Sequence, residues 1–170
     1  RNKKMPGSSF PTSTKKCGVG SKLKSVPGST CHKCYAARLE AYRESVANGY
    51  MKNWIITNDM IAENMDLWVE GIVYQILHFY KKTDVKYHRW FDAGDAYSVE
   101  WFIAIAKVAR KTPDFKHWFP TREKAHYLEY LRNHKQPSNL IIRVSSAMID
   151  GLPLKGFKNT STVHKNKIHF

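Results

Sequence analysis

Three cysteines are the residues of this sequence whose types and spacing most clearly suggest chemistry. Cys17, Cys31 and Cys34 lie within eighteen residues in a C-x13-C-x2-C pattern. An odd, closely spaced set of thiols is not a disulfide framework, but thiolates grouped in this way are ligands for zinc or for an iron–sulfur cluster. The alternative is that they are unrelated small buried side chains, as many free cysteines are. Their spacing, in a basic loop that contains several glycines, favours a metal centre.

Zinc and an iron–sulfur cluster make different demands on the rest of the chain. Structural zinc requires a fourth ligand. His32 lies between two of the cysteines and is awkwardly placed for this role, so another of the eight histidines would be needed. A [4Fe–4S] cluster can instead be held by three thiolates, with one iron left open, and positive charge or a helix N-terminus stabilises its thiolates. Five lysines flank the cysteines and favour the cluster: Lys15, Lys16, Lys22, Lys24 and Lys33.

A second group of polar residues is the run 92–95, Asp-Ala-Gly-Asp. It follows a short β-like segment and precedes a helical one. This order places it at the carboxyl edge of a sheet, where open α/β sheets and barrels bind their ligands. Gly94 lets a ligand approach the backbone. Asp92 or Asp95 can accept a hydrogen bond from an ammonium group or coordinate a divalent ion.

Two other interpretations of this run remain open. It can be a polar turn whose carboxylates cap the helix that starts near Ser98. It can also belong to a metal-dependent nuclease, in which His88, Asp92 and Asp95 hold Mg²⁺ and the basic ends of the chain bind phosphate. The nuclease interpretation gives the cysteines no role.

Hydrophobic periodicity predicts the elements that must position these groups. Residues 1–30 have the composition of a loop with at most one short strand near residues 8–14, and a helix begins near residues 31–34 and stops at Asn48-Gly49. Further helices are predicted at about residues 53–80, 99–111 and 121–133, and strands at 87–91, 116–119 and 140–144. Alternating strands and helices with short connections predict an α/β fold, either a partial β/α barrel or an open parallel sheet with about four β/α units.

Length and composition indicate the domain organisation. The 170 residues make a single domain, too short for a closed eight-unit β/α barrel of about 250 residues. Hydrophobic residues make up 42% and aromatic residues 13% of the chain, which excludes a disordered protein. We expect a basic cysteine-containing loop at residues 1–34, an α/β body at 35–150 and a basic C-terminal extension at 151–170.

Positive charge is concentrated at the two ends of the chain. The net charge is +14; residues 1–39 hold nine basic side chains and no acid, and residues 151–170 hold four and no acid. Such ends bind polyanions or keep a protein in solution. DNA or RNA is therefore a candidate partner, through the basic residues Lys15, Lys16, Lys22, Lys24, Lys155 and Lys158. Aromatic side chains stack on bases when they are exposed and otherwise belong to the core; the candidates are Trp90, Trp118, Tyr127 and Tyr130.

No secretion signal or membrane span is expected. The basic start of the sequence is followed by no apolar run. The most apolar stretch, residues 54–80, is interrupted by Asp59, Glu63, Asp66 and Glu70. We therefore expect a cytoplasmic protein that does not bind membranes.

The order of these motifs resembles a known family. The most specific segments are residues 27–36 (PGSTCHKCYA) and 89–95 (RWFDAGD), followed by Thr-Pro-Asp at the end of the next helix and Phe-Pro-Thr-Arg at the end of the next strand. Over about residues 8–150 the chain resembles a little-characterised family of bacteriophage proteins that are similar to a trimmed radical S-adenosylmethionine (SAM) fold. The resemblance implies a location in the cytoplasm of the infected bacterial cell.

The resemblance also implies roles for individual residues. Radical SAM enzymes hold a [4Fe–4S] cluster through three cysteines, which here would be Cys17, Cys31 and Cys34. The open iron takes the amino and carboxylate groups of SAM, and the turn after the second strand receives the amino group. In this chain that turn contains Ala93, Gly94 and Asp95. Further candidates are Arg122 for the SAM carboxylate, and Ser145 and Ser146 for the ribose.

The function expected from this resemblance is that of an iron–sulfur protein that binds SAM and acts on an unknown substrate, with nucleic acid as one candidate. The sequence leaves open whether the protein is an enzyme, and no catalytic residue is predicted. The alternative is a non-enzymatic nucleic-acid-binding module in which an iron–sulfur or zinc site is structural.

Overall fold

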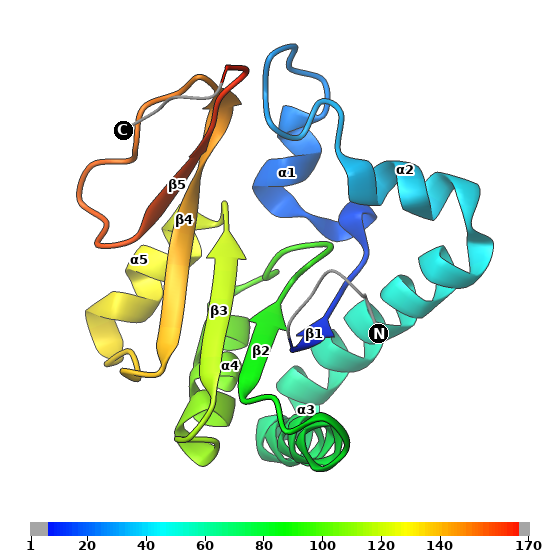
Figure 1. The fold of residues 1–170 in the computed structure, drawn as a ribbon, viewed down its shortest axis with the longest axis vertical. Coiled ribbons are helices and arrows are strands. Elements are labelled where there is room, and N and C mark those ends of the chain that lie inside the picture. Colours follow the sequence, from blue (N-terminus) through cyan, green and yellow to red (C-terminus); the bar gives the residue numbers. More distant parts are fainter. Residues whose placement is uncertain (1–6, 167–170) are drawn as a thin grey trace.

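A five-stranded parallel sheet forms the centre of the computed structural model, which describes residues 7–166. The strands follow one another in the order β1-β2-β3-β4-β5 (Figure 1). The α/β class and the open parallel sheet are therefore confirmed. The sheet does not close into a full barrel, because β1 and β5 are its two edges in the part of the chain that is described, and a partial β/α barrel stays a prediction. The strands are β1 (Ser8–Phe10), β2 (Tyr87–Trp90), β3 (Lys116–Thr121), β4 (Leu140–Ile149) and β5 (Thr160–Val163).

Helices cover one face of this sheet. In Figure 1, α4 and α5 lie behind β2, β3 and β4, while α1 and α2 lie near the end toward which the strands point. The helices are α1 (Gly18–Leu23), α2 (Tyr35–Tyr42), α3 (Glu44–Thr83), α4 (Val99–Lys111) and α5 (Lys124–Asn133), with a short 3-10 helix η1 (Thr14–Lys16) before α1. The region read as loop from the sequence thus contains two short helices in addition to β1.

Buried and exposed side chains alternate along the strands, so the sheet has one face covered by helices and one uncovered face. Trp90, Phe119 and Ile142 are almost fully buried on the helix side, where Phe102 of α4 packs against Phe119 with ring centroids 4.8 Å apart. The opposite face, which we call the uncovered face, carries the side chains Tyr87, Arg89, Lys116, Trp118, Ile141 and Arg143. Parallel sheets are usually covered on both sides, so the uncovered face is an unusual surface.

The long helix α3 departs from the prediction at both ends. Its 40 residues run through the expected stop at Asn48-Gly49, whereas α2 ends earlier, at Tyr42. Nothing lies within 4 Å of the position that a Cβ atom on Gly49 would take, so this glycine costs only about 1 kcal/mol of helix propensity. The helix is bent at Asn64, whose φ of −154° and ψ of 79° are not helical. The Asn64 side chain accepts a hydrogen bond from the Leu67 amide at 3.1 Å and so starts the second half.

Strand β3 continues past the predicted stop at Phe119 to Thr121. At Pro120 this strand pairs with β4 only, since β2 has already ended. The missing amide hydrogen of proline is tolerated at such a position. The predicted C-terminal extension also contains a strand, β5, which pairs with β4.

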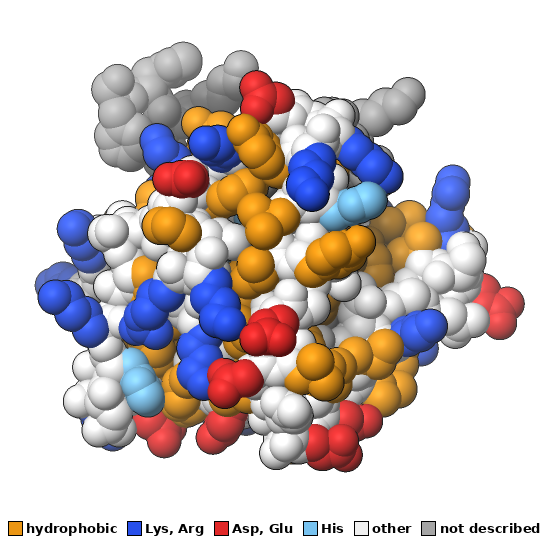
Figure 2. Space-filling model, turned by 90° about the horizontal axis from the view of Figure 1, so that it is seen from below, with side chains coloured by type: hydrophobic (Ala, Val, Ile, Leu, Met, Phe, Trp, Pro, Cys, Tyr) orange, Lys and Arg blue, Asp and Glu red, His pale blue; other side chains and the backbone are white. Residues whose placement is uncertain are grey.

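Positive and negative side chains are mixed on the surface of the α/β body. Figure 2 shows the end of the molecule from which the strands start, where Lys and Arg side chains are interspersed with Asp and Glu. Residues 1–6 and 167–170, which carry part of the charge of the two basic ends, lie outside the described residues. Among residues 7–166, no helix is both long and apolar enough to span a membrane.

Candidate functional site

A cavity of about 300 Å³ at the carboxyl edge of the sheet is lined by all three cysteines. The same cavity is lined by most of the other residues singled out in the sequence: Ala93, Gly94, Asp95, Arg122 and Ser145. Ser146 is the exception, because its side chain is buried and its hydroxyl lies 3.5 Å from the Met148 carbonyl. Parallel strands bring these residues together because the segments that follow them meet at one edge.

Two helix N-termini position the cysteines. Cys17 is the residue before α1 and Cys34 is the residue before α2, and neither side chain caps its helix by a hydrogen bond. A Cβ atom on Gly20 would lie 3.6 Å from the sulfur atoms of both Cys17 and Cys31, so these two sulfurs face the same point. All three thiols are free of disulfide bonds.

Burial favours the neutral form of two of these thiols, those of Cys17 and Cys31. It raises the pKa of Cys17 to about 12, with Asp95 acting in the same direction and Lys24 opposing it. Burial also raises the pKa of Cys31, although the Arg122 guanidinium opposes this. Such thiols are poor nucleophiles, whereas a bound metal removes the proton outright. The cavity therefore suits ligation better than thiol catalysis.

No group of three or more His, Cys, Asp or Glu side chains within residues 7–166 is arranged to hold a single metal ion. The Mg²⁺ site expected for a nuclease is therefore not formed. Of its three members, His88 has its Nδ1 atom 2.7 Å from the Ser8 hydroxyl, and Asp95 is surrounded by donors from the protein. For the same reason, the three cysteines are not arranged around a preformed site for one zinc ion in the described residues.

Two buried glutamates fix the loops that carry the cysteines. Glu40, 5% exposed, accepts hydrogen bonds from the Ser13 hydroxyl at 2.9 Å and the Thr14 amide at 2.7 Å. Glu123, 6% exposed, accepts from the Val19 amide at 2.7 Å, in the first turn of α1. Both were missed in the sequence, because a single acid in a helical segment resembles an ordinary surface residue.

Strand β4 and Arg122 hold the segment before Cys31. The Thr30 amide donates to the Ala147 carbonyl at 2.9 Å, and the Thr30 hydroxyl oxygen accepts from the Arg122 guanidinium at 2.7 and 3.1 Å. This contact places a fixed positive charge beside the cysteine cavity. Arg122 thus lies where an anionic cluster or a carboxylate would meet it.

Gly94 is required by the protein chain itself. Its φ is +84°, and a Cβ atom there would lie only 2.6 Å from the Thr12 carbonyl oxygen. The Thr12 amide also donates to the Ala93 carbonyl at 2.9 Å. The segment after β1 therefore passes directly against the turn, which explains the glycine without a ligand.

Asp95 joins the turn to the end of β3. Its Oδ1 atom accepts from the Ala96 amide at 2.8 Å and the Thr121 hydroxyl at 2.7 Å, and its Oδ2 atom accepts from the Arg122 amide at 2.8 Å. Burial outweighs these donors and raises the pKa of Asp95 to about 7. The carboxylate of Asp95 does not cap α4, because its donors belong to Ala96, Thr121 and Arg122, outside the helix. At the start of α4, the Ser98 hydroxyl donates a hydrogen bond to the Glu100 carboxylate. The capping interpretation is wrong.

Three of the four aromatic residues considered for base stacking belong to the core. Trp90 and Tyr130 are fully buried and Tyr127 is 8% exposed, so stacking by these residues is excluded. Trp118 is 40% exposed, with the Arg89 guanidinium 4.5 Å from its ring centroid.

The basic residues near the cysteines have different surroundings. Lys16 lies over the Trp54 ring, 4.4 Å from its centroid, and Lys24 donates to the Thr14 carbonyl at 3.1 Å. Four other lysines considered as polyanion ligands are exposed: Lys15, Lys22, Lys155 and Lys158. Of this set, only Lys24 is near enough to Cys17 to lower the pKa of its thiol.

Comparison with known proteins places the chain in a family. A family model described as Gene product 88 matches residues 6–167, almost the whole chain. The chain therefore belongs to the Gene product 88 family, whose description has the form given to bacteriophage genes and states no activity. Comparison with curated proteins and with solved structures finds no match.

Proposed function

We propose that this protein binds a [4Fe–4S] cluster through Cys17, Cys31 and Cys34, and that it binds SAM at the same cavity. The observation that carries the proposal is the convergence of three free thiols, the Asp-Ala-Gly-Asp turn and a guanidinium on one cavity at the carboxyl edge of a parallel sheet. A cluster of four irons separates its thiolates more widely than a single ion does, so the lack of a single-ion site is compatible with it.

Each lining residue has a role in this proposal. Cys17 and Cys34, which precede α1 and α2, and Cys31 would be the cluster ligands, and the fixed charge of Arg122 favours a negative group beside Cys31. When bound, the cluster would supply an open iron for SAM and the electron that cleaves SAM to a carbon radical. Arg122 would hold the SAM carboxylate and Ser145 would hydrogen-bond the ribose, while Ala93 and Gly94 present backbone groups to the amino group. Asp95 would act mainly by holding this turn against β3.

Spectroscopy of cysteine variants tests cluster binding. The protein reconstituted under anaerobic conditions is expected to be brown, with a broad absorption at about 400 nm. Cys31→Ser and Cys34→Ser should lose this band. His32→Ala is the matched control, because His32 lies between these cysteines but is exposed, with its ring nitrogen 3.0 Å from the Lys24 carbonyl. A colourless wild-type protein that binds zinc, and loses it in His32→Ala, would replace the cluster with a zinc site.

Incubation of the reduced protein with SAM tests the second half of the proposal. The expected product is 5′-deoxyadenosine, and Arg122→Gln should weaken SAM binding while the cluster absorption stays. A protein with a full, reducible cluster that neither binds nor cleaves SAM would be an iron–sulfur protein without SAM chemistry.

Nucleic-acid binding is the second candidate function, and the uncovered face is the observation that favours it. None of the five strands contains an Asp or Glu residue, whereas Arg89, Lys116 and Arg143 lie on this face. Tyr87 is 50% and Trp118 is 40% exposed there. Exposed aromatic rings between cations are typical of surfaces that bind single-stranded nucleic acid.

Variants distinguish the uncovered face from the basic ends. With a labelled single strand of about 12 nucleotides, Trp118→Ala is expected to lower the affinity about tenfold, since stacking on one base contributes about 1–3 kcal/mol. Changing Lys15, Lys16, Lys22 and Lys24 to Gln should instead flatten the dependence of affinity on salt. A protein with no affinity at about 50 mM salt would exclude this function on either surface.

A further inference from the structure

The uncovered face of the sheet continues into the cysteine cavity. Arg89 of β2 and Trp118 of β3 are neighbours in the sheet register, and both line this cavity together with the three cysteines. The same two side chains also line a smaller cavity of about 220 Å³, on the half of the sheet where the strands start. A ligand that contacts Trp118 therefore lies beside the cysteine cavity and can extend along the uncovered face.

The smaller cavity combines apolar and cationic side chains. Tyr87, Trp118 and Ile141 are its exposed apolar residues. Its cations are Arg89 and Lys116, and no Asp or Glu of the described chain lines it. An exposed aromatic ring beside cations suits a flat ring that carries a negative group.

The two cations of this cavity have different surroundings. The Arg89 guanidinium lies 4.5 Å from the centroid of the Trp118 ring, and its charge opposes the rise that burial causes in the pKa of Asp92. Lys116 is exposed and forms no ion pair within residues 7–166. Arg89 therefore helps to hold the Trp118 ring in place, whereas the charge of Lys116 is available to an anion.

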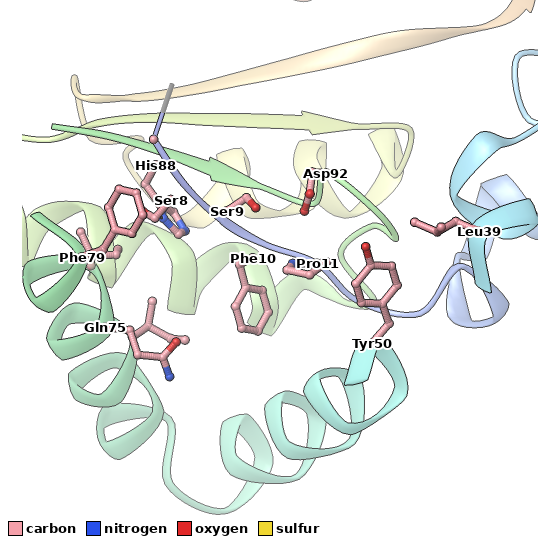
Figure 3. A pocket seen from close by; sticks show the side chains of 13 residues that line it. Ser8, Ser9, Phe10, Pro11, Leu39, Tyr50, Gln75, Phe79, His88 and Asp92 are labelled. Carbon is pink, nitrogen blue, oxygen red and sulfur yellow. The ribbon is translucent and has the colours of Figure 1, made fainter. Parts of the chain in front are cut away.

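A larger cavity, of about 700 Å³, lies between β1 and the two halves of α3 (Figure 3). In Figure 3, Tyr50 extends from the first half of α3, and Gln75 and Phe79 extend from the second half. No Lys or Arg among the described residues lines this cavity. An anionic ligand therefore finds its countercharge on the uncovered face and not here.

We propose that the substrate of the cysteine site is a nucleotide, free or as one unit of a single strand, whose base stacks on Trp118 and whose phosphate contacts Lys116. These residues are two positions apart on β3, so their side chains project from the same face about 7 Å apart. The base then lies at the border of the cysteine cavity, and the phosphate lies in the smaller cavity. This inference rests on the proposed function, because it names the substrate class of that site.

Fragments of one nucleotide test the two contacts. UMP has a base and a phosphate, uridine lacks the phosphate and ribose 5-phosphate lacks the base; uracil also avoids competition with the adenosine part of SAM. Titrated into the full chain at about 50 mM salt, UMP is expected to bind about fivefold more tightly than uridine and about tenfold more tightly than ribose 5-phosphate. No binding of UMP, or equal binding of the three, would overturn the proposal.

Variants place the base and the phosphate. Trp118→Ala should weaken UMP and uridine about tenfold and leave ribose 5-phosphate unchanged. Lys116→Gln should weaken UMP and ribose 5-phosphate about fivefold and leave uridine unchanged. Tyr74→Ala and Lys52→Gln are the matched controls, because they remove an exposed aromatic ring and an exposed charge from α3. Losses in the controls as large as those in the two variants would contradict the site.

A tetranucleotide of uridylate distinguishes a strand from a free nucleotide. Arg143 of β4 is exposed and pairs in register with Pro120, on the side of Trp118 away from Lys116, where a strand would place its neighbouring phosphate. If the substrate is a strand, the tetranucleotide binds more tightly than UMP and Arg143→Gln removes this advantage. A tetranucleotide that binds no better than UMP identifies a free nucleotide as the substrate.

A cysteine variant separates this inference from the proposed function. Cys31→Ser should bind UMP as the wild type does, because both contacts come from β3. In the cluster-loaded protein with SAM, UMP should increase the rate at which 5′-deoxyadenosine forms, and Trp118→Ala should lose this increase. UMP that binds without changing SAM cleavage would show that the uncovered face is not the substrate site. A protein that binds UMP but holds no cluster would refute the proposed function, and with it the substrate role, while the nucleotide site itself would stand.

Discussion

The two aspartates of the Asp-Ala-Gly-Asp turn, Asp92 and Asp95, differ in how completely the protein bonds their carboxylate oxygens. Asp95, at the cysteine cavity, accepts three hydrogen bonds from its neighbours. Asp92, which lines both the cysteine cavity and the larger cavity between β1 and α3, has one buried carboxylate oxygen without a hydrogen-bond partner, and the Arg89 charge opposes the rise that burial causes in its pKa. The three bonds of Asp95 therefore hold the turn against β3 without any ligand, and Asp92 contributes less to this support. In the function that we propose, this support keeps the turn in place beside the metal centre of the cysteines.

The largest expected loss of stability comes from removing Glu40, which bonds to Ser13 and Thr14 in the loop that leads to Cys17. Glu40→Ala removes two buried hydrogen bonds and leaves the Thr14 amide unsatisfied, so the free energy of unfolding should fall by about 4 kcal/mol. Urea denaturation of the metal-free protein measures this. Glu63→Ala, at an exposed position of α3, is the control and should change stability by less than about 0.5 kcal/mol. Similar effects of the two changes would mean that the loop does not depend on Glu40.

Two glycines with the same φ, Gly94 and Gly156, separate the cost of backbone strain from the cost of a steric contact at the Asp-Ala-Gly-Asp turn. Gly94→Ala combines the strain of a φ of +84° with a close contact to Thr12, and should lower the free energy of unfolding by about 3 kcal/mol. Gly156→Ala has the same φ but nothing within 4 Å of its Cβ position, so strain alone should cost about 1 kcal/mol. Thermal or urea unfolding of both variants compares them. Equal losses would show that contact with Thr12 is unimportant.

The same Asp→Asn change should lower the free energy of unfolding more at Asp95 than at Asp92. Asp95→Asn places an amide NH2 group against a donor and should cost about 2 kcal/mol. Asp92→Asn should cost less, about 1 kcal/mol, because one of its oxygens makes no bond to lose and the change removes mainly the attraction to the Arg89 charge. Unfolding free energies of the two variants at pH 7.5 provide the comparison. A loss in Asp92→Asn as large as that in Asp95→Asn would mean that the two aspartates support the turn equally.

A pH series tests whether His88 of β2 is buried and uncharged in the folded protein. Burial, with a smaller contribution from His117, lowers the pKa of His88 to about 3. The unfolded chain then binds a proton at pH 5 that the folded chain does not, so His88 stabilises the fold above about pH 6.5 and loses this contribution as the pH falls. Relative to His88→Gln, the wild type should lose about 2 kcal/mol between pH 7.5 and pH 5. Because His117 and Asp95 titrate in both proteins, their contributions cancel. A constant difference between the two proteins would mean that His88 is solvated.

The sequence predicted the parts of this account that depend on residue types at short spacing. The cysteine pattern and the Asp-Ala-Gly-Asp run stood out locally. Parallel topology placed the run at the carboxyl edge of the sheet, whereas the position of the cysteines beside it was predicted only from the family resemblance. The supports Glu40 and Glu123 could not be predicted, because their partners lie 26 and 104 residues away. The true reason for Gly94 is a contact with Thr12, which is equally non-local. The course of α3 could not be predicted either. The helix bends at Asn64 and continues through Gly49, where packing overrides local propensity.

Metal and sulfide analysis of the full chain purified without oxygen tests the central claim most directly. If Cys17, Cys31 and Cys34 hold a [4Fe–4S] cluster, the protein should contain about four irons and about four sulfides per chain, and the Cys31→Ser variant should contain neither. One zinc per chain with no sulfide, or a wild-type protein that retains no metal after reconstitution, would contradict the account.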